Sequence, residues 1–286
     1  MNIFAGIATM NIRPIYRLSP WVSEHFDKLN WSSLSANPRA ISLLKQHPEL
    51  IDWKRLSSNP NAMEILLANV DRIDFSEFSK NPNAVGYLTK HPELIDWSSL
   101  SRNKNAVELI LANHEKVDTH QLCFNPHPAI IQLLRKRKKR NPNCINWANL
   151  CTNPSAFDFL GDNIPKVNWK TFSANPSAIH ILEMNINRVS YEHLSRNPSA
   201  IHILTNYLWM INWKNLSGNP SAVDLLKANP EKIDFPSLSA NPAIFELDYE
   251  SMRLNFQPFA DEIIALALSP ERVSKYRDMG FGYDDW

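Results

Sequence analysis

The densest group of charged residues in the sequence is a run of six cations: Arg135, Lys136, Arg137, Lys138, Lys139 and Arg140. Clustered guanidinium and ammonium groups bind phosphate or an acidic protein surface, and such a run is also typical of a nuclear localisation signal. The alternative is a solvated helix end whose cations offset the helix dipole. Because the formal net charge of the whole chain is +1, any contact with nucleic acid or an anionic membrane must be local. Residues 135–140 are therefore the candidate binding patch.

A second group that could do chemistry consists of acidic and histidine side chains. The same repeat position in four successive units holds Asp158, His180, His202 and Asp224. A metal ion needs its ligands about 2 Å away, whereas neighbouring helices lie about 8–10 Å apart. The spacing favours a polar stripe on one surface, and we predict no metal site.

Catalytic motifs are missing from the sequence. It contains no Gly-rich phosphate loop, Walker motif, GxSxG or HExxH, and only six glycines. Three cysteines, Cys123, Cys144 and Cys151, have no CxxC spacing, which indicates reduced thiols. No nucleophile with a base and no paired carboxylates stand out. We expect a non-enzymatic protein with no cofactor and no small-molecule substrate.

These residues lie within a repeat of 22 residues. An aromatic residue marks each unit, and Thr119 takes its slot in the fifth; the aromatic slots are Trp31, Trp53, Phe75, Trp97, Trp147, Trp169, Tyr191, Trp213 and Phe235. Six positions after every slot stands an Asn, and a Pro follows it in nine of ten units, Asn103-Lys104 being the exception. The period indicates an array of ten units.

The repeat positions predict two short helices per unit. Asn followed by Pro is typical of a helix start, and Ala40, Ile41, Leu43 and Leu44 follow at helical spacing. An Asp or Asn before the aromatic slot can cap a second, shorter helix. Helices this short bury their apolar faces only by stacking on the next copy. We predict an all-α fold, an α-solenoid of about ten two-helix repeats with N- and C-terminal helical caps.

The stacking distance also predicts an overall shape, and a leucine-rich repeat is the competing fold. Ten units at the usual 8–10 Å would form a rod or shallow superhelix about 90–100 Å long. Leucine-rich repeats have a similar period and also carry Leu and Asn, but their strand needs a Leu-x-Leu alternation that is missing here. A Pro after the Asn also favours a helix start over a strand.

Three regions follow from the repeat boundaries. Residues 1–30 are expected to form an N-terminal extension and cap, in which Ser19-Pro20 begins a helix. Residues 31–242 form the solenoid, with six extra residues within 126–142 that lengthen one helix by about 9 Å. Residues 243–286 form a C-terminal cap and tail, with helices over 259–268 and after Ser269-Pro270; the final Trp286 either packs back or serves as a docking anchor.

The chain has no uninterrupted run of the ~20 apolar residues that a membrane span needs. It also lacks the basic segment, apolar stretch and cleavage site of a secretory signal. We therefore expect no membrane span and a cytosolic location.

The unit Leu-Ser-x-Asn-Pro-x-Ala-Ile-x-Leu-Leu, closed by Ile-Asp-Trp, resembles the Asn-Pro repeats in proteins of large nucleocytoplasmic DNA viruses, chloroviruses especially. The resemblance covers about residues 31–242. The segment Leu-Ser-Pro-Glu-Arg-Val-Ser-Lys-Tyr within 259–280 is similar to a C-terminal element of the same viral proteins. No functional residue can be transferred from that family, since Lys104, Thr119 and the insertion depart from its pattern.

The resemblance implies a structural component of a virus particle, with a minor capsid protein that bridges or cements capsid proteins as the leading expectation. One alternative is an adaptor that binds a host or viral protein along one solenoid face. The other is a nucleic-acid contact through residues 135–140, which would be sensitive to salt.

Overall fold

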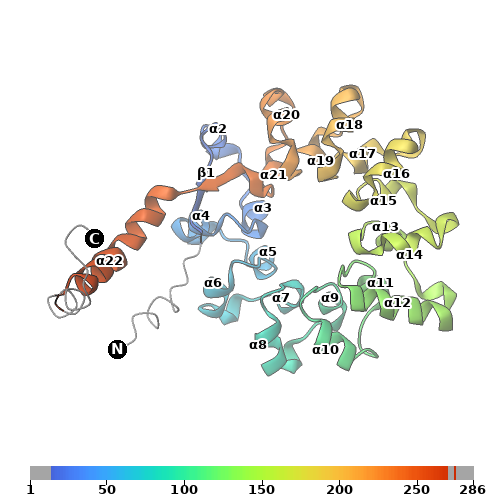
Figure 1. The fold of residues 1–286 in the computed structure, drawn as a ribbon, viewed down its shortest axis with the longest axis horizontal. Helices are drawn as coiled ribbons and strands as arrows, with labels where there is room; N and C mark the ends of the chain where they lie inside the picture. Colours follow the sequence, from blue (N-terminus) through green and yellow to red (C-terminus); the bar gives the residue numbers. More distant parts are fainter. Residues whose placement is uncertain (1–13, 270–273, 275–286) are drawn as a thin grey trace. The chain divides into compact units, whose positions relative to one another are not determined.

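The computed structural model describes residues 14–269 and Ser274. Two compact units make up the chain: Leu18–Phe245, and a second unit that joins Met1–Arg17 to Glu246–Trp286. The first unit consists of short helices in a repeating pattern, which confirms the all-α solenoid (Figure 1). The helix predicted after Ser269-Pro270 and the terminal Trp286 lie outside the described residues.

The first helix of each unit begins at the aromatic slot, as predicted. In nine of the ten units the preceding Asp or Asn side chain accepts a hydrogen bond from a backbone N–H in the first turn; Ser190 makes no such bond. We call these helices the inner layer: α3 (Trp31–Ala36), α5 (Trp53–Ser57), α7 (Phe75–Lys80), α9 (Trp97–Leu100), α11 (Thr119–Leu122), α13 (Trp147–Cys151), α15 (Trp169–Phe172), α17 (Tyr191–Leu194), α19 (Trp213–Ser217) and α21 (Phe235–Ser239).

A second set of helices, the outer layer, follows the Asn-Pro pair. Its members are α4 (Ile41–Gln46), α6 (Met63–Leu67), α8 (Val85–Lys90), α10 (Val107–Ala112), α12 (Pro128–Arg140), α14 (Phe157–Gly161), α16 (Ile179–Met184), α18 (Ile201–Asn206) and α20 (Val223–Lys227). A 3-10 turn follows most of them: η2 (Pro48–Leu50), η3 (Val70–Arg72), η4 (Pro92–Leu94), η5 (Pro142–Cys144), η7 (Ile164–Lys166), η9 (Ile186–Arg188), η11 (Leu208–Met210) and η13 (Pro230–Lys232).

The Asn-Pro pair does not start the outer α-helix directly, which corrects the prediction. Pro opens a turn or a 3-10 segment, and α4 begins four residues after Asn37, with Ala40 at its N-cap. In the later units this segment is a defined 3-10 helix: η6 (Pro154–Ala156), η8 (Pro176–Ala178), η10 (Pro198–Ala200), η12 (Pro220–Ala222) and η14 (Pro242–Ile244). The Asn still caps this segment, because its Oδ1 accepts the N–H two residues on, as Asn153 does from Ser155.

Between the two layers lies the apolar core. In the first unit Leu34, Ala40 and Leu44 have 0% exposed surface, and the equivalent positions repeat this in most units. Burying one Leu side chain contributes about 1.5–3 kcal/mol, so the core accumulates by addition from unit to unit.

Buried asparagines connect each unit to the one before it. Asn59 Nδ2 donates to the backbone oxygens of Ser35 (3.0 Å) and Asn37 (2.9 Å), while its Oδ1 accepts from the backbone N–H of Asn61 (3.0 Å). The Asn of all ten units makes this set of bonds and is at most 1% exposed. We call each such residue an Asn rung. It is fully satisfied in the interior, where an unpaired amide would be costly.

A second set of polar residues, which we call the Ser rungs, lies beside the Asn rungs. Ser35 Oγ donates to Trp31 O (2.8 Å) and accepts from the backbone N–H of Asp52 in the next unit (3.0 Å). The fifth and sixth units carry Cys123 and Cys151 at this position, so two of the three thiols stand in for a serine hydroxyl.

The solenoid closes into a ring, so the expected rod is wrong. Asn37 Nδ2 in the first unit donates to Ser239 O (3.0 Å) and Asn241 O (3.1 Å) in the tenth. Asn30 N donates to Ser239 Oγ (2.9 Å). Both rungs thus continue from the tenth unit to the first with the same bonds as elsewhere, and α3 packs beside α21 (Figure 1).

The N-terminal segment supplies the outer half of the tenth unit and does not cap an open end. It contains α2 (Pro20–Ser23) and η1 (Phe26–Lys28), and Ser19 bonds to Ile244 O through N (2.9 Å) and Oγ (2.6 Å). Lys28 lies 5.1 Å from the Phe235 ring centroid, as Lys232 lies 4.6 Å from that of Trp213 within the ninth unit. Val22 is 0% exposed, at the position equivalent to Leu44. The N-terminal segment is therefore not a cap on an open end, because closure leaves the first unit no free face.

The shape of a unit explains the closure. Its inner side is one helix of four to six residues followed by a narrow Ser-x-Asn turn, whereas its outer side holds a helix and a 3-10 turn. Each unit is therefore a wedge, and identical rung bonds repeat the same rotation at every junction. Ten such wedges complete one turn.

The second unit is described by itself. The strands β1 (Tyr16–Leu18) and β2 (Phe245–Leu247) pair in a two-stranded sheet, and Arg17 forms an ion pair with Glu246 at 2.9 Å. α22 (Tyr249–Ala267) contains most of the helix predicted over 259–268 and begins ten residues earlier. Among the described helices, none has the length and apolar character to cross a membrane.

Candidate binding surfaces of the ring

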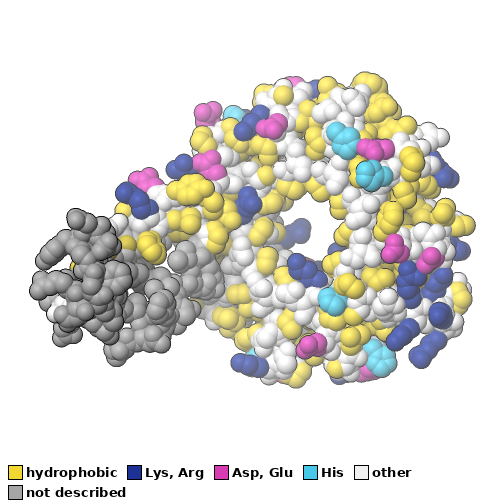
Figure 2. All heavy atoms as spheres, in the orientation of Figure 1, with side chains coloured by type: hydrophobic (Ala, Val, Ile, Leu, Met, Phe, Trp, Pro, Cys, Tyr) yellow, Lys and Arg dark blue, Asp and Glu magenta, His cyan; other side chains and the backbone are white. Residues whose placement is uncertain are grey.

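The predicted basic patch lies on α12, which has 13 residues while the other outer helices have five or six. The six-residue insertion therefore lengthens this helix, as expected. It belongs to the outer layer, where Figure 2 shows a group of Lys and Arg side chains.

Three of the six cations are held by neighbouring units. Arg135 forms an ion pair with Asp162 (2.6 Å) and lies over the Phe159 ring at 4.7 Å. Lys138 donates to Asn163 Oδ1 and lies over the rings of Trp147 (5.6 Å) and Phe159 (5.7 Å). These contacts attach the extended helix to the sixth unit.

Arg137 contacts the slot of the fifth unit, where Thr119 replaces the aromatic residue. In five other units a cation in the turn after the outer helix stacks on the slot ring, as Arg72 does on Trp53 (4.9 Å). In the fifth unit Arg137 donates to Thr119 Oγ1 and to His114 O. The insertion and the loss of the aromatic residue are thus two parts of one local change.

The other three cations, Lys136, Lys139 and Arg140, are exposed and form no ion pair or hydrogen bond with the described residues. The structure therefore divides the patch into a structural half and a solvent-facing half. Its proposed contact with phosphate or acidic protein stays a prediction.

The polar ladder predicted on the outer surface contains an acid that sequence reasoning missed. Glu183 lies between two of its members, at 2.6 Å from His202 Nε2 and 3.4 Å from His180 Nδ1. Hydrogen bonding to His202 lowers the pKa of Glu183. The three side chains form a bridge across two adjacent units, and no group able to hold a metal ion occurs among the residues that the structure describes.

The opening of the ring has a wall of its own. Inner-layer helices surround it in Figure 1, and Figure 2 shows the opening with Lys and Arg side chains at its edge. The third, fourth and sixth residues after each slot are buried in the core and the rungs, which leaves the first, second and fifth to face this side. From the eighth unit round to the first, a pocket is lined entirely by residues at those three positions. We call these thirty positions the inner wall.

The inner wall is strongly basic although the molecule is nearly neutral. It carries two acids, Glu77 and Glu192, and seven cations: Lys54, Arg55, Lys80, Arg102, Lys170, Arg196 and Lys214. With histidine neutral its net charge is +5, against +1 for the whole chain. Only Lys80, with Glu77 at 2.6 Å, and Lys170, with Glu192 at 3.8 Å, form ion pairs within the described structure.

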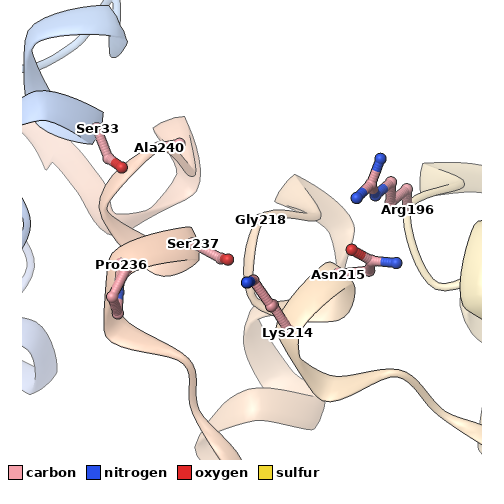
Figure 3. A pocket seen from close by; sticks show the side chains of 8 residues that line it. All are labelled: Ser33, Arg196, Lys214, Asn215, Gly218, Pro236, Ser237 and Ala240. Atoms are coloured by element: carbon pink, nitrogen blue, oxygen red, sulfur yellow. The ribbon is translucent and has the colours of Figure 1, made fainter.

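The pocket in this wall has a volume of about 440 Å³. Arg196 and Lys214 lie at its edge together with Ser33, Asn215 and Ser237, and its other lining residues are Gly218, Pro236 and Ala240 (Figure 3). Two residues at the fifth position of the pocket are small, Gly218 and Ala240, as are the residues at this position in four other units; Lys80, Arg102, Phe124 and Arg196 occupy it in the remaining four. It contains no acidic side chain.

Sequence reasoning missed this wall because only two of its seven cations, Lys54 and Arg55, are adjacent in the sequence. They recur at fixed positions of the 22-residue period, so the only signal was a comparison of the ten units position by position. Closure then brings those positions onto one surface.

The cysteines are free, as expected from their spacing. Burial raises the pKa of the Cys123 thiol to about 11, and burial also raises that of Cys151. Both thiols are therefore protonated and unreactive near neutral pH.

Three consecutive exposed apolar side chains form a cluster on the outer surface at η11. Leu208, Trp209 and Met210 are 42%, 76% and 49% exposed. The position of Trp209 holds Glu49, Asp71, Glu93, Glu115, Asn143, Pro165, Asn187, Glu231 or Asp27 in the other units. Trp209 packs edge-on against Tyr207 at 5.7 Å, which fixes its orientation on the surface.

No protein-family model, curated protein or solved structure matches the chain. The resemblance to viral Asn-Pro repeats stays a prediction from the sequence.

Proposed function

We propose that the protein is a non-enzymatic scaffold whose ring presents a binding surface to another protein, and that this occurs within the particle of a large DNA virus, as a minor capsid protein. The apolar cluster Leu208–Met210 is the observation that supports protein binding. Exposed aromatic and Met side chains on a rigid element are typical anchors of protein interfaces.

The use of the repeat residues also supports a scaffold. The residues that recur from unit to unit pack in the core or form the Asn and Ser rungs. The residues that vary between units lie at exposed positions. A ring of this kind holds its surface residues at fixed mutual distances. Because the solenoid is closed, it would join partners around its circumference.

Mass spectrometry of purified particles tests the location. Copies of the chain in particles, with crosslinks from residues near Trp209 to a capsid protein, support the proposal. Absence from particles together with capture of a host protein from infected cells would favour the adaptor.

Substitution at η11 tests the surface. Trp209→Ser with Met210→Ser should lower partner binding at least tenfold and leave thermal unfolding unchanged, because both side chains are exposed. Leu111→Ser, on α10 and 42% exposed, is the control for removal of an exposed apolar group. Equal binding by both variants would refute η11 as the contact.

A further inference from the structure

The inner wall points to a ligand that does not depend on the partner at η11. We propose that the opening of the ring binds phosphate groups, either of a small polyphosphate compound or of a single nucleic-acid strand, with Arg196 and Lys214 as the principal contacts.

Charge is the first argument. Five of the seven wall cations, Lys54, Arg55, Arg102, Arg196 and Lys214, form no ion pair with described residues. Arg102 stacks on Phe124 at 4.3 Å, and the other four extend as exposed side chains. Cations gathered around a concave surface reinforce one another's potential and attract anions to it.

The neutral residues of the pocket favour phosphate. The hydroxyls of Ser33 and Ser237 form no hydrogen bond with described residues, so both can donate to an anion. Hydroxyl, amide, Lys and Arg groups are the usual donors to phosphate oxygens. An acidic peptide would need apolar anchoring sites as well. The wall has one aromatic residue, Phe124, and otherwise only Ala and Pro as apolar residues.

The dimensions permit both sources of phosphate. Ten helices about 8–10 Å apart enclose a circle about 25–32 Å across between axes. Subtracting helix radii of about 5–6 Å on each side leaves an opening on the order of 15–20 Å. A pocket of about 440 Å³ within this wall lies in the range that holds a small ligand.

The test uses the full-length chain at about 0.15 M salt. Calorimetry with tripolyphosphate and fluorescence anisotropy with a labelled oligothymidylate compare wild type with the double variant Arg196→Gln, Lys214→Gln. The matched control is Lys90→Gln, Lys166→Gln, which removes the same charge from exposed side chains of the outer surface. We expect at least a tenfold rise in the Kd of the wall variant and a change below twofold for the control.

A third variant separates the pocket from charge alone. A Cβ at Gly218 would lie 3.6 Å from Ser237 O, an ordinary contact, so Gly218→Met should fold and fill the pocket. It should weaken tripolyphosphate binding at unchanged net charge. Thermal unfolding and scattering profiles equal to wild type verify that each ring is intact.

The two sources give different results. A strand should bind more tightly than tripolyphosphate, with a salt dependence that falls by about 1.4 in slope when two cations are removed; a small polyphosphate should bind with equal or greater affinity than the strand. Equal loss in the Lys90, Lys166 control, no binding of either probe, or tighter binding of poly-glutamate than of both would overturn the proposal.

Discussion

The two basic surfaces of the ring place their cations in opposite relations to their neighbours. On α12 six cations are consecutive, yet Arg135, Arg137 and Lys138 are bound to an acid, aromatic rings and oxygens of the same and adjacent units. On the inner wall the cations are spread over six units, and most lie exposed among serine, asparagine and glycine.

The difference teaches that charge density along a sequence does not measure charge available to a ligand. A consecutive run on a helix points in all directions, so part of it must meet the neighbouring units. Charges at equivalent inner-wall positions of a closed solenoid all point towards its opening, so they gather on one surface.

The comparison depends on closure, so the most severe test opens the ring. Val22→Asp would bury a carboxylate at a 0% exposed position in the composite tenth unit. An uncompensated buried charge costs about 3–5 kcal/mol, and chemical denaturation should report a loss of this size. Phosphate binding should weaken with it.

The neighbouring Ser23→Asp places the same charge at an exposed position of α2 and should change stability by less than about 0.5 kcal/mol. If the two variants are equally stable, the N-terminal segment does not hold the ring closed.

The Asn rungs set the geometry of the inner wall, and one unit offers an internal comparison. Asn81→Ala removes bonds to Ser57 O (3.1 Å) and Asn59 O (2.8 Å) and leaves both oxygens buried. At about 1–3 kcal/mol for each of the two oxygens, the loss should be about 2–6 kcal/mol by urea unfolding.

The control is Asn83→Ala, because Asn83 spans the same two units through an exposed bond to Pro60 O (2.7 Å). Its cost should be below about 1 kcal/mol, since water replaces the lost partner. A rung variant as stable as this control would show that the buried amides do not order the wall.

Substitution of a cation that contacts its neighbours should destabilise the protein more than substitution of a cation that faces solvent. Arg135→Ala removes an ion pair with Asp162 and a contact with the Phe159 ring, and should cost about 1 kcal/mol, discounted because both charged groups are partly exposed. Arg196→Ala and Lys139→Ala should stay within about 0.5 kcal/mol of wild type. A loss at Arg196 as large as at Arg135 would mean that the wall cations are structural too.

The sequence predicted the repeat and its helices because period, capping residues and apolar spacing are local properties. It did not predict closure, since the first unit's partner lies at the other end of the chain. Residues 19–29 lack the aromatic slot and the Asn-Pro pair, and so looked like a cap. Their only signal was register, with His25 at the position of His47 and Leu29 at that of Ile51.

The candidate sites show the same limit. Residues 135–140 were visible as a run, but their partners Asp162, Asn163 and Thr119 lie in other parts of the repeat. The inner wall needed both the alignment of units and the knowledge that its positions face one opening. Local spacing can give the first, and only the three-dimensional closure gives the second.

The smallest expected effect concerns the thiol in the Ser rung of the fifth unit. Cys123→Ser should change stability by less than about 0.5 kcal/mol near pH 7, since a hydroxyl serves this position in eight other units. At high pH the two proteins should diverge. The pKa of Cys123 is about 11 in the folded chain against 9.0 as its ordinary value, so the unfolded chain loses its proton first.

The protonated thiol therefore favours the folded state fully below pH 9 and progressively less between pH 9 and 11, by up to about 1.4 kcal/mol per pH unit. Urea unfolding at pH 8 and pH 10 should show the Ser variant gaining on wild type at the higher pH. Cys144→Ser, which removes a half-buried thiol outside the rung, is the control. A constant difference between Cys123→Ser and wild type at both pH values would show that this rung is open to solvent, and the inner layer would then be less tightly closed than the comparison with α12 requires.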